Sequence, residues 1–232
     1  HIRIGTFEFF AARGDLDGKR ALADYTIARH HPQLRDDPDR YFALFEAVAE
    51  RQSSLVARWM QFGFIHGVMN TDNMTVSGET IDFGPCAFMD EYDPATVYSF
   101  IDRRGRYAYG NQPGILQWNL ARLAETLLPL IDADEGQAIE RATASLQGVS
   151  ARIDRHWLAG FQRKLGLSVH EDGDHALVTD LLAVMHAEAA DFTNTYRALA
   201  DAVTDDAALP ESFIAWTRRW RARLAREPGG VA

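Results

Sequence analysis

The stretch HGVMNTDNMTVSGETIDFGP, residues 66–85, decides the fold class of this chain. Residues 74–76 and 79–82 flank a Ser-Gly pair, the pattern of two short strands joined by a tight turn. Asn73 directly precedes the first of these strands, and Asp82 ends the second. We therefore expect a small β-hairpin that brings the side chains of Asn73 and Asp82 close together.

This spacing of polar residues is typical of a phosphate-transfer site. Such sites place carboxylate and amide oxygens around a divalent cation. Protein-kinase-like folds use a catalytic Asp, an Asn five residues later, and the Asp of an Asp-Phe-Gly motif. Asn73 and the motif at 82–84 match, but Val68 stands where the catalytic Asp belongs. An aliphatic side chain cannot accept a proton, so the carboxylate of Asp72 is the candidate replacement.

Helical patterns surround this stretch. The clearest covers about 39–62, where a broad apolar stripe stops at Gly63. Residues 2–12 begin as a β-capable stretch and then become helix-compatible, and residues 19–30 predict a short helix. Residues 83–113 read as a long loop, whose length suggests a function. Further helices are expected at 115–131, 134–147, 150–165, 175–190, 192–203 and 211–226.

Together these elements predict one α+β, predominantly α-helical domain over residues 1–232. Its expected fold is a protein-kinase-like C-terminal lobe with a catalytic loop and a small β-hairpin. Residues 1–12 would be the end of the N-terminal lobe or the hinge, and residues 13–232 the helical lobe. The chain begins at His1 without an initiator Met or signal peptide, so we expect the N-terminal lobe to precede it.

Composition excludes some classes of partner. Of the 232 residues, 47% are hydrophobic and 25% charged, as in ordinary soluble proteins. The net charge of -9 argues against nucleic acid and against anionic membranes as main partners, while ATP requires only a local set of donors. No apolar run approaches the roughly 20 residues that span a bilayer. Cys86 is the only cysteine, which excludes a disulfide within this segment and favours a reducing compartment.

Five blocks of the sequence, in order, resemble the selenoprotein O (SelO) family. The resemblance is strong over residues 1–125 and sparse in motifs beyond. It implies a pseudokinase-like enzyme that binds ATP in a flipped orientation. Such an enzyme transfers AMP to Ser, Thr or Tyr hydroxyls of proteins and releases pyrophosphate. The blocks are residues 1–13, 66–73, 80–85, 90–94 and 107–113.

The resemblance also implies roles for individual residues. Asp72 would be the catalytic base, and Asn73 and Asp82 would hold Mg²⁺ or Mn²⁺. Asp82 would also lie against the nucleotide, and Arg3 would contact its phosphates, to which a guanidinium binds in a bidentate manner. A Gly-rich segment, a lysine and a second arginine are expected before residue 1, and a redox-active selenocysteine or cysteine after Ala232. The family occurs in bacteria and mitochondria, so we expect the bacterial cytoplasm, or the mitochondrion in a eukaryote.

Two other functions stay open at this point. A kinase that phosphorylates a small molecule would share the metal loop, although Val68 counts against it. A catalytically inactive pseudokinase that binds nucleotide or partner proteins is the other alternative. The intact set of Asp72, Asn73 and Asp82 counts against that reading.

Several polar residues have a structural explanation beside the functional one. His66 is expected to brace the loop, as are Asn111 and Gln112, and Arg3 could instead pair with Glu8 or another nearby acid. Cys86 is expected to be a small buried side chain rather than a redox thiol.

Two polar clusters near the C-terminus are also expected to be structural. The first is the polar stretch at 170–175, which could be drawn as a metal cluster. A loop leading to a helix N-cap at Asp174 explains it better. The second is a row of arginines that predicts a solvated helix face alternating with Trp216, Trp220 and Leu224. Its members are Arg218, Arg219, Arg221, Arg223 and Arg226.

Overall fold

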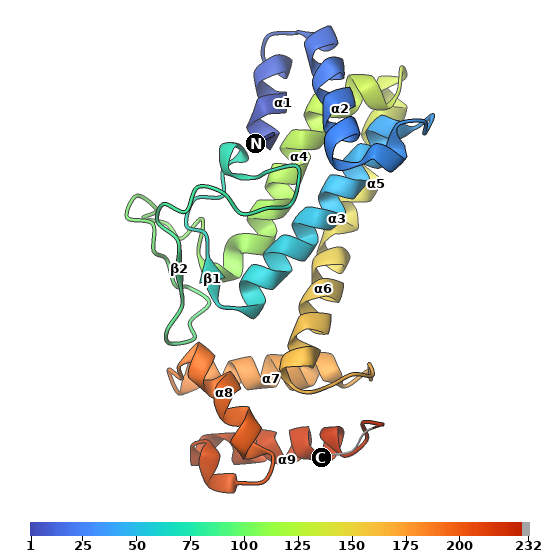
Figure 1. The fold of residues 1–232 in the computed structure, drawn as a ribbon. Coiled ribbons are helices and arrows are strands. Elements are labelled where there is room, and N and C mark those ends of the chain that lie inside the picture. The colour runs from blue at the N-terminus through green and yellow to red at the C-terminus, as the bar shows by residue number, and fades with distance from the viewer. Residues whose placement is uncertain (229–232) are drawn as a thin grey trace.

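The computed structural model describes residues 1–228 and is mostly helical, with one two-stranded antiparallel sheet (Figure 1). The segment expected after Ala232 lies outside the described residues. The helices are α1 Ile4–Ala11, α2 Leu16–His30, α3 Arg40–Gln61, α4 Gln112–Ile131, α5 Glu135–Gln147, α6 Val149–Lys164, α7 Asp174–Ala187, α8 Phe192–Ala202 and α9 Ile214–Leu224. The strands are β1 Phe64–Ile65 and β2 Ala87–Phe88, and short 3₁₀ turns occur at Pro32–Leu34, Thr71–Asn73, Tyr109–Asn111, Asp206–Ala208 and Glu211–Phe213.

The central helix α3 organises the fold. The centre of its apolar stripe, formed by Phe45, Val48 and Val56, is buried, and α3 packs against α4 and α6. Helix α3 ends where the sequence predicts, because Gly63 has a φ of 66° and glycine adopts this left-handed conformation at little cost. Figure 1 shows α1, α2 and α5 gathered around one end of α3, α4 and α6, and α7 to α9 at the other end.

The remaining predicted helices are confirmed with small shifts at their ends. Helix α2 starts at Leu16, before the expected Lys19, because the Asp15 carboxylate accepts a hydrogen bond from the Gly18 N–H at 2.8 Å. Helix α4 starts at Gln112 because Pro113 lies in its first turn, where its missing N–H has no partner to lose. No helix among residues 1–228 is long and apolar enough to cross a membrane.

The β-hairpin expected at residues 74–82 is the main difference from prediction. The chain does turn at Ser77 and Gly78, but only one antiparallel bridge forms across it, between Met74 and Thr80. The Thr75 hydroxyl accepts from the Glu79 N–H at 3.0 Å and donates to the Glu79 carbonyl at 2.8 Å, so it replaces a longer ladder. The two-stranded sheet forms outside this turn instead, between β1 and β2.

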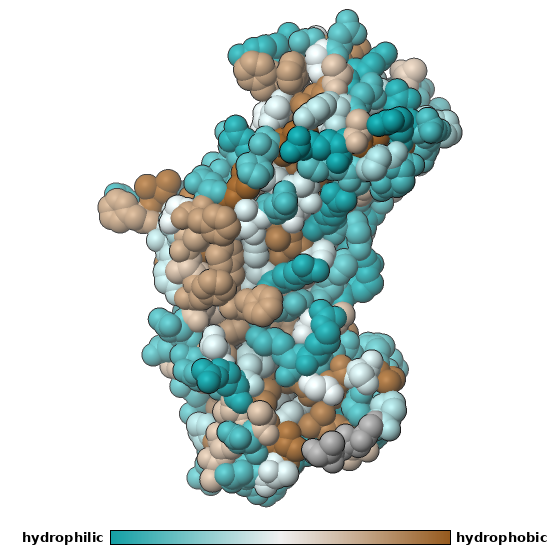
Figure 2. Space-filling view, in the orientation of Figure 1, coloured by the Kyte–Doolittle hydropathy of each residue, from teal (hydrophilic) through white to brown (hydrophobic). Residues whose placement is uncertain are grey.

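The loop at 83–113 is ordered yet largely irregular, as its glycines and prolines predict. It contains β2 and the turn Tyr109–Asn111, and α4 begins at its end. Tyr109 anchors it, since its buried hydroxyl donates to the Met60 carbonyl at 2.6 Å. Apolar side chains are exposed along it, and Figure 2 shows brown surface where Figure 1 draws β2 and the neighbouring loops. The large exposed apolar residues of this loop are Phe83, Phe88, Tyr98, Phe100 and Ile101.

Helices α7 and α9 correct two predictions. Gly173 holds the N-cap position, and Asp174 is instead the first helical residue, fully buried. Its carboxylate pairs with Arg223, whose Nε lies 2.7 Å from Oδ1. The arginine row on α9 is therefore not a uniformly solvated face, because Arg223 is buried. Trp216 and Trp220 are buried as the alternation predicts.

Candidate functional site

A buried histidine holds the loop at 66–73. The His66 Nε2 lies 2.8 Å from the Ile81 carbonyl, and its Nδ1 lies 3.4 Å from the Val68 N–H. A neutral ring with its proton on Nε2 satisfies both contacts. Burial lowers the pKa of His66, although the Ile81 carbonyl and the Asp82 charge oppose this effect. The neutral form is therefore favoured, and the expected bracing role is confirmed.

Gln112, at the start of α4, holds the same loop from the other side. Its side-chain oxygen accepts from the His66 N–H at 3.1 Å, and its amide nitrogen donates to the Phe64 carbonyl at 3.0 Å. Gln112 is fully buried, so both of its polar ends are satisfied inside the protein. Asn111 also braces, by donating to the Gly105 carbonyl at 2.7 Å.

Asn73 lies in the 3₁₀ turn Thr71–Asn73 and is buried. Its amide nitrogen donates to the Val68 carbonyl at 2.9 Å. The hydrogen bond fixes which end of the amide faces the loop, because a nitrogen donates and the carbonyl oxygen is left as an acceptor. The backbone of Val68 therefore positions the Asn73 amide.

Asp82 follows the turn and is exposed. Its φ of 54° lies in the left-handed region, which is uncommon for a residue other than glycine and is often found at functional sites. The Gly84 N–H donates to the Asp82 carbonyl at 2.8 Å. The preceding Thr80 is fixed by the Trp59 indole, which donates to its hydroxyl at 2.9 Å. These bonds hold the backbone on both sides of an exposed carboxylate.

Arg3 and Asp72 lie together at the start of α1. The Arg3 Nη1 donates to the Asp72 carbonyl at 3.2 Å and lies 3.8 Å from the Asp72 Oδ1. Both side chains are exposed, Arg3 to 44% and Asp72 to 64%, so the pair adds little to stability. The acid beside Arg3 is therefore Asp72 and not Glu8. Arg3 is brought here by an antiparallel bridge with Thr75.

Gly5, which the sequence analysis did not single out, makes room for Asp72. A β-carbon built at position 5 would lie 2.4 Å from the Asp72 Oδ1 and 3.4 Å from its backbone nitrogen. Real β-carbons essentially never come this close to another heavy atom. The carboxylate therefore rests against the first turn of α1 only because residue 5 lacks a side chain. No local sequence pattern indicates this contact, because Gly5 and Asp72 lie far apart in the chain.

The residues present fit a divalent cation of the Mg²⁺ type. Asn73 offers an amide oxygen and Asp82 an exposed carboxylate, both oxygen ligands. Mg²⁺ keeps several waters and is completed by substrate phosphates, so two protein ligands suffice. Within residues 1–228 no group of three or more His, Cys, Asp or Glu side chains forms a closed metal site.

The structure joins these residues in two groups. Arg3 and Asp72 are in direct contact, whereas Asn73 and Asp82 are linked through the His66 ring and the backbone of Val68 and Ile81. No hydrogen bond joins Asn73 to Asp82 among the described residues. Cys86 is half-buried beside this loop.

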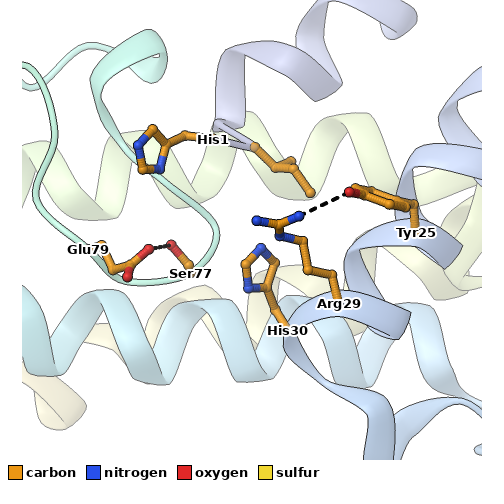
Figure 3. Close-up of a pocket in the computed structure, with 7 residues that line it drawn as sticks. His1, Tyr25, Arg29, His30, Ser77 and Glu79 are labelled. Carbon is orange, nitrogen blue, oxygen red and sulfur yellow. Dashed lines mark hydrogen bonds between the residues drawn. The ribbon is translucent and has the colours of Figure 1, made fainter.

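A separate hollow of about 530 Å³ lies between α2, the chain start and the turn at Ser77 (Figure 3). Figure 3 shows Arg29 reaching Tyr25, whose hydroxyl accepts at 3.1 Å, and Ser77 bonded to Glu79 at 2.7 Å. None of the predicted site residues lines this hollow. The candidate site is therefore distinct from this hollow.

A protein-family model described as protein adenylyltransferase SelO matches residues 1–223. The chain belongs to the SelO family. This confirms the resemblance drawn from the sequence blocks, and it extends that resemblance through α7, α8 and most of α9, where the blocks gave no motif.

Curated relatives agree with the SelO assignment. A protein named protein nucleotidyltransferase YdiU from Rhizobium johnstonii is 62% identical, with 98% of this chain and 47% of the relative aligned. Proteins of the same name from Rhizobium etli and Cereibacter sphaeroides are 61% and 62% identical, covering 100% and 97% of this chain and 48% of each relative. The chain spans about half the length of the curated relatives it matches.

Proposed function

We propose that the full-length protein transfers AMP from ATP to Ser, Thr or Tyr hydroxyls of other proteins. The observation that carries this proposal is that the loop has its carboxylate at residue 72 and an aliphatic side chain at residue 68. Val68 cannot act as a base, while the exposed Asp72 carboxylate lies beside the Arg3 guanidinium. Membership in a family described as adenylyltransferases supports the same reaction.

The helical unit is proposed to be the C-terminal lobe of a protein-kinase-like fold. The order of its parts supports this: a long central helix, a loop with Asn73, a turn, and the Asp82-Phe83-Gly84 motif. The early residues up to α1 would then adjoin the other lobe, from which the remaining nucleotide contacts would come.

In the proposed reaction the substrate hydroxyl attacks the α-phosphorus of ATP. A bond forms between the hydroxyl oxygen and phosphorus, the bond to the β-phosphate oxygen breaks, and pyrophosphate leaves. Asp72 orients the hydroxyl and accepts its proton. Arg3 contacts the phosphates. Its guanidinium is exposed and lies 3.8 Å from the Asp72 carboxylate, so a phosphate can replace this long contact.

Asn73 and Asp82 are proposed to hold Mg²⁺ or Mn²⁺. When bound, the cation neutralises phosphate charge and supplies Lewis-acid chemistry. The contribution of this chain is to fix the two ligands: the Val68 carbonyl orients the Asn73 amide, and the bonds around Thr80 and Gly84 hold the backbone of Asp82. The bacterial cytoplasm is the proposed compartment, supported by the bacterial origin of the relatives.

Transfer of label from ATP tests the reaction. The full-length protein is incubated with Mg²⁺ or Mn²⁺ and ATP labelled on either the α- or the γ-phosphate, and labelled protein is measured. We expect label from the α-phosphate alone, and its loss in Asp82→Ala. Label from the γ-phosphate would instead show a kinase, and no label would show a nucleotide-binding scaffold.

A matched variant distinguishes the loss of a site residue from the loss of any exposed negative charge. Asp36→Ala removes another exposed carboxylate, which has no ion pair or hydrogen bond among residues 1–228. It is expected to keep parental transfer. Parental transfer by Asp82→Ala would contradict the site assignment.

A further inference from the structure

A second polar surface lies where α3 and α6 end and α8 begins (Figure 1). Two adjoining hollows, of about 440 and 290 Å³, share the side chains of Phe62 and Lys164. Arg58 and Arg163 line the first hollow, and Arg197 lines the second. We call this surface the Lys164 groove, formed by Arg58, Phe62, Arg163, Lys164 and Arg197.

Lys164 is the fixed centre of the groove. Its ammonium donates to the Gln61 carbonyl at 2.5 Å and lies 3.8 Å from the ring centre of Tyr196 and 4.7 Å from that of Phe192. Aromatic faces attract a cation, so the ammonium stays at the base of both hollows. Burial lowers the pKa of Lys164 to about 8, so most of the population is still charged at neutral pH. A neighbouring carboxylate would favour that charged form further.

The arginines of the groove are available to a ligand. Ten arginines among residues 1–228 form ion pairs, but Arg58, Arg163 and Arg197 form none within that range. All three are exposed. No Asp or Glu lines either hollow. The groove therefore presents four cations and no compensating carboxylate.

The charge of the rest of the protein restricts which anion fits. The whole chain carries a net charge of -9, so a long polyanion such as nucleic acid would meet repulsion beyond the groove. A small inorganic ion would use one hollow and leave the Phe62 ring, which is 60% exposed, without a partner. A short segment with carboxylates on both sides of an apolar residue would engage both hollows and cover Phe62.

We propose that the Lys164 groove docks an acidic segment of a partner protein, with an apolar residue on Phe62 and carboxylates against Arg163 and Arg197. This site is separate from the proposed transfer chemistry. It would serve to recruit a protein, and it does not depend on that chemistry.

Binding of a defined peptide tests the proposal in the full-length protein. The probe is a fluorescein-labelled peptide with paired glutamates on both sides of a central phenylalanine, measured by fluorescence polarisation at low and high salt. We expect saturable binding that weakens with salt. The double variant Arg163→Glu/Arg197→Glu is expected to weaken it by about tenfold or more, because two attractions become repulsions.

Matched controls distinguish this site from a general charge effect. Arg20→Glu reverses an exposed arginine on α2 that has no ion pair among residues 1–228, and it should change binding less than about twofold, as expected for a charge distant from the ligand. Phe62→Ala should weaken the phenylalanine peptide but not its counterpart with a central glycine. Equal binding of a glutamine-substituted peptide would overturn the proposal. So would unchanged binding by the double variant, no binding at all, or preferential binding of inorganic phosphate or single-stranded DNA.

Discussion

The Asp72 carboxylate rests on the first turn of α1, in space that exists because position 5 has no side chain. A substitution at Gly5 is therefore expected to affect helix stability and the position of Asp72 in opposite directions. Alanine favours a helix over glycine by up to about 1 kcal/mol, whereas its β-carbon would take the place of the Asp72 Oδ1.

We predict that Gly5→Ala lowers AMP transfer by roughly 10- to 100-fold, since small misplacements of a catalytic group have effects of this size. The temperature of unfolding should be unchanged or slightly raised. Gly114→Ala is the control, because a β-carbon at this helical glycine meets nothing within 4 Å. Label incorporation and thermal unfolding are measured on all three proteins. Parental activity in Gly5→Ala would show that Asp72 need not lie where the structure places it.

His31, between α2 and the turn Pro32–Leu34, gives a second prediction for a single residue. Burial, together with the nearby charges of Arg51 and His30, lowers its pKa from 6.5 to about 4. Between these two pH values the unfolded chain binds a proton that the folded chain does not. The free energy of unfolding should therefore fall as the pH drops from 6.5 toward 4, by up to about 3 kcal/mol from this group.

Urea denaturation across this pH range checks the effect. His31→Gln should flatten the dependence, whatever its own stability at neutral pH. His175→Gln, at an exposed histidine, should leave the parental slope. An equally steep fall in His31→Gln would assign the pH dependence to other groups.

Single residues also show what the sequence could and could not predict. His66 was expected to brace the loop because it lies behind the proposed metal ligands, and Gln112 because its block offered no other role. The role of Gly5 could not be foreseen, since it depends on a contact between segments 67 residues apart in sequence, a spacing that follows from Gly5 and Asp72. Local patterns carry no information on such approaches.

Helices α7 and α9 are joined by charges as well as by apolar contacts. Arg223 is 5% exposed and Asp174 fully buried, and the Arg223 Nη1 also lies 2.7 Å from Glu227. Burial opposes ionisation of Asp174, but hydrogen bonds from Arg223, the Glu171 N–H and Gln162 outweigh it and lower its pKa. The network is thus an internal tie between two elements that the sequence showed only as a polar loop and an arginine row.

We predict that Arg223→Met lowers the free energy of unfolding by about 3–5 kcal/mol, because it leaves the Asp174 charge buried without its partner. The double variant Asp174→Leu/Arg223→Met should recover part of this loss. Arg218→Met, at an exposed position, should change stability by no more than about 0.5 kcal/mol. Urea denaturation followed by tryptophan fluorescence, to which the buried Trp216 and Trp220 contribute, measures all three. A small effect of Arg223→Met would mean that water reaches the pair.

The arginine row illustrates why elements were predicted better than their packing. Helical periodicity identified α9 and placed Trp216 and Trp220 inside, since apolar spacing is a local property. The sequence placed Arg223 on the exposed face with the other arginines, because charged side chains are normally exposed to solvent. The buried Asp174, 49 residues away, and the nearby Glu227 compensate the charge of the buried guanidinium.

Across the whole molecule, the helical order and the ends of most helices follow from the sequence. The hairpin at 74–82 did not, because the Thr75 side chain replaces strand hydrogen bonds with its own. The sheet forms instead from residues 64–65 and 87–88, whose pairing encloses the entire candidate loop. Because the two strands pair, the ends of the segment 66–85 lie close together, and this one loop carries both Asn73 and Asp82.

The most direct test of the central claim is the mass of the product on a protein substrate. The full-length protein is incubated with ATP, a divalent cation and a hydroxyl-bearing protein, and the substrate is examined by mass spectrometry with peptide mapping. The proposed site predicts a gain of one AMP group on a Ser, Thr or Tyr side chain, lost in Asp72→Asn and retained in Asp36→Asn. A gain of a phosphoryl group, or an AMP adduct that persists in Asp72→Asn at the parental rate, would contradict the account.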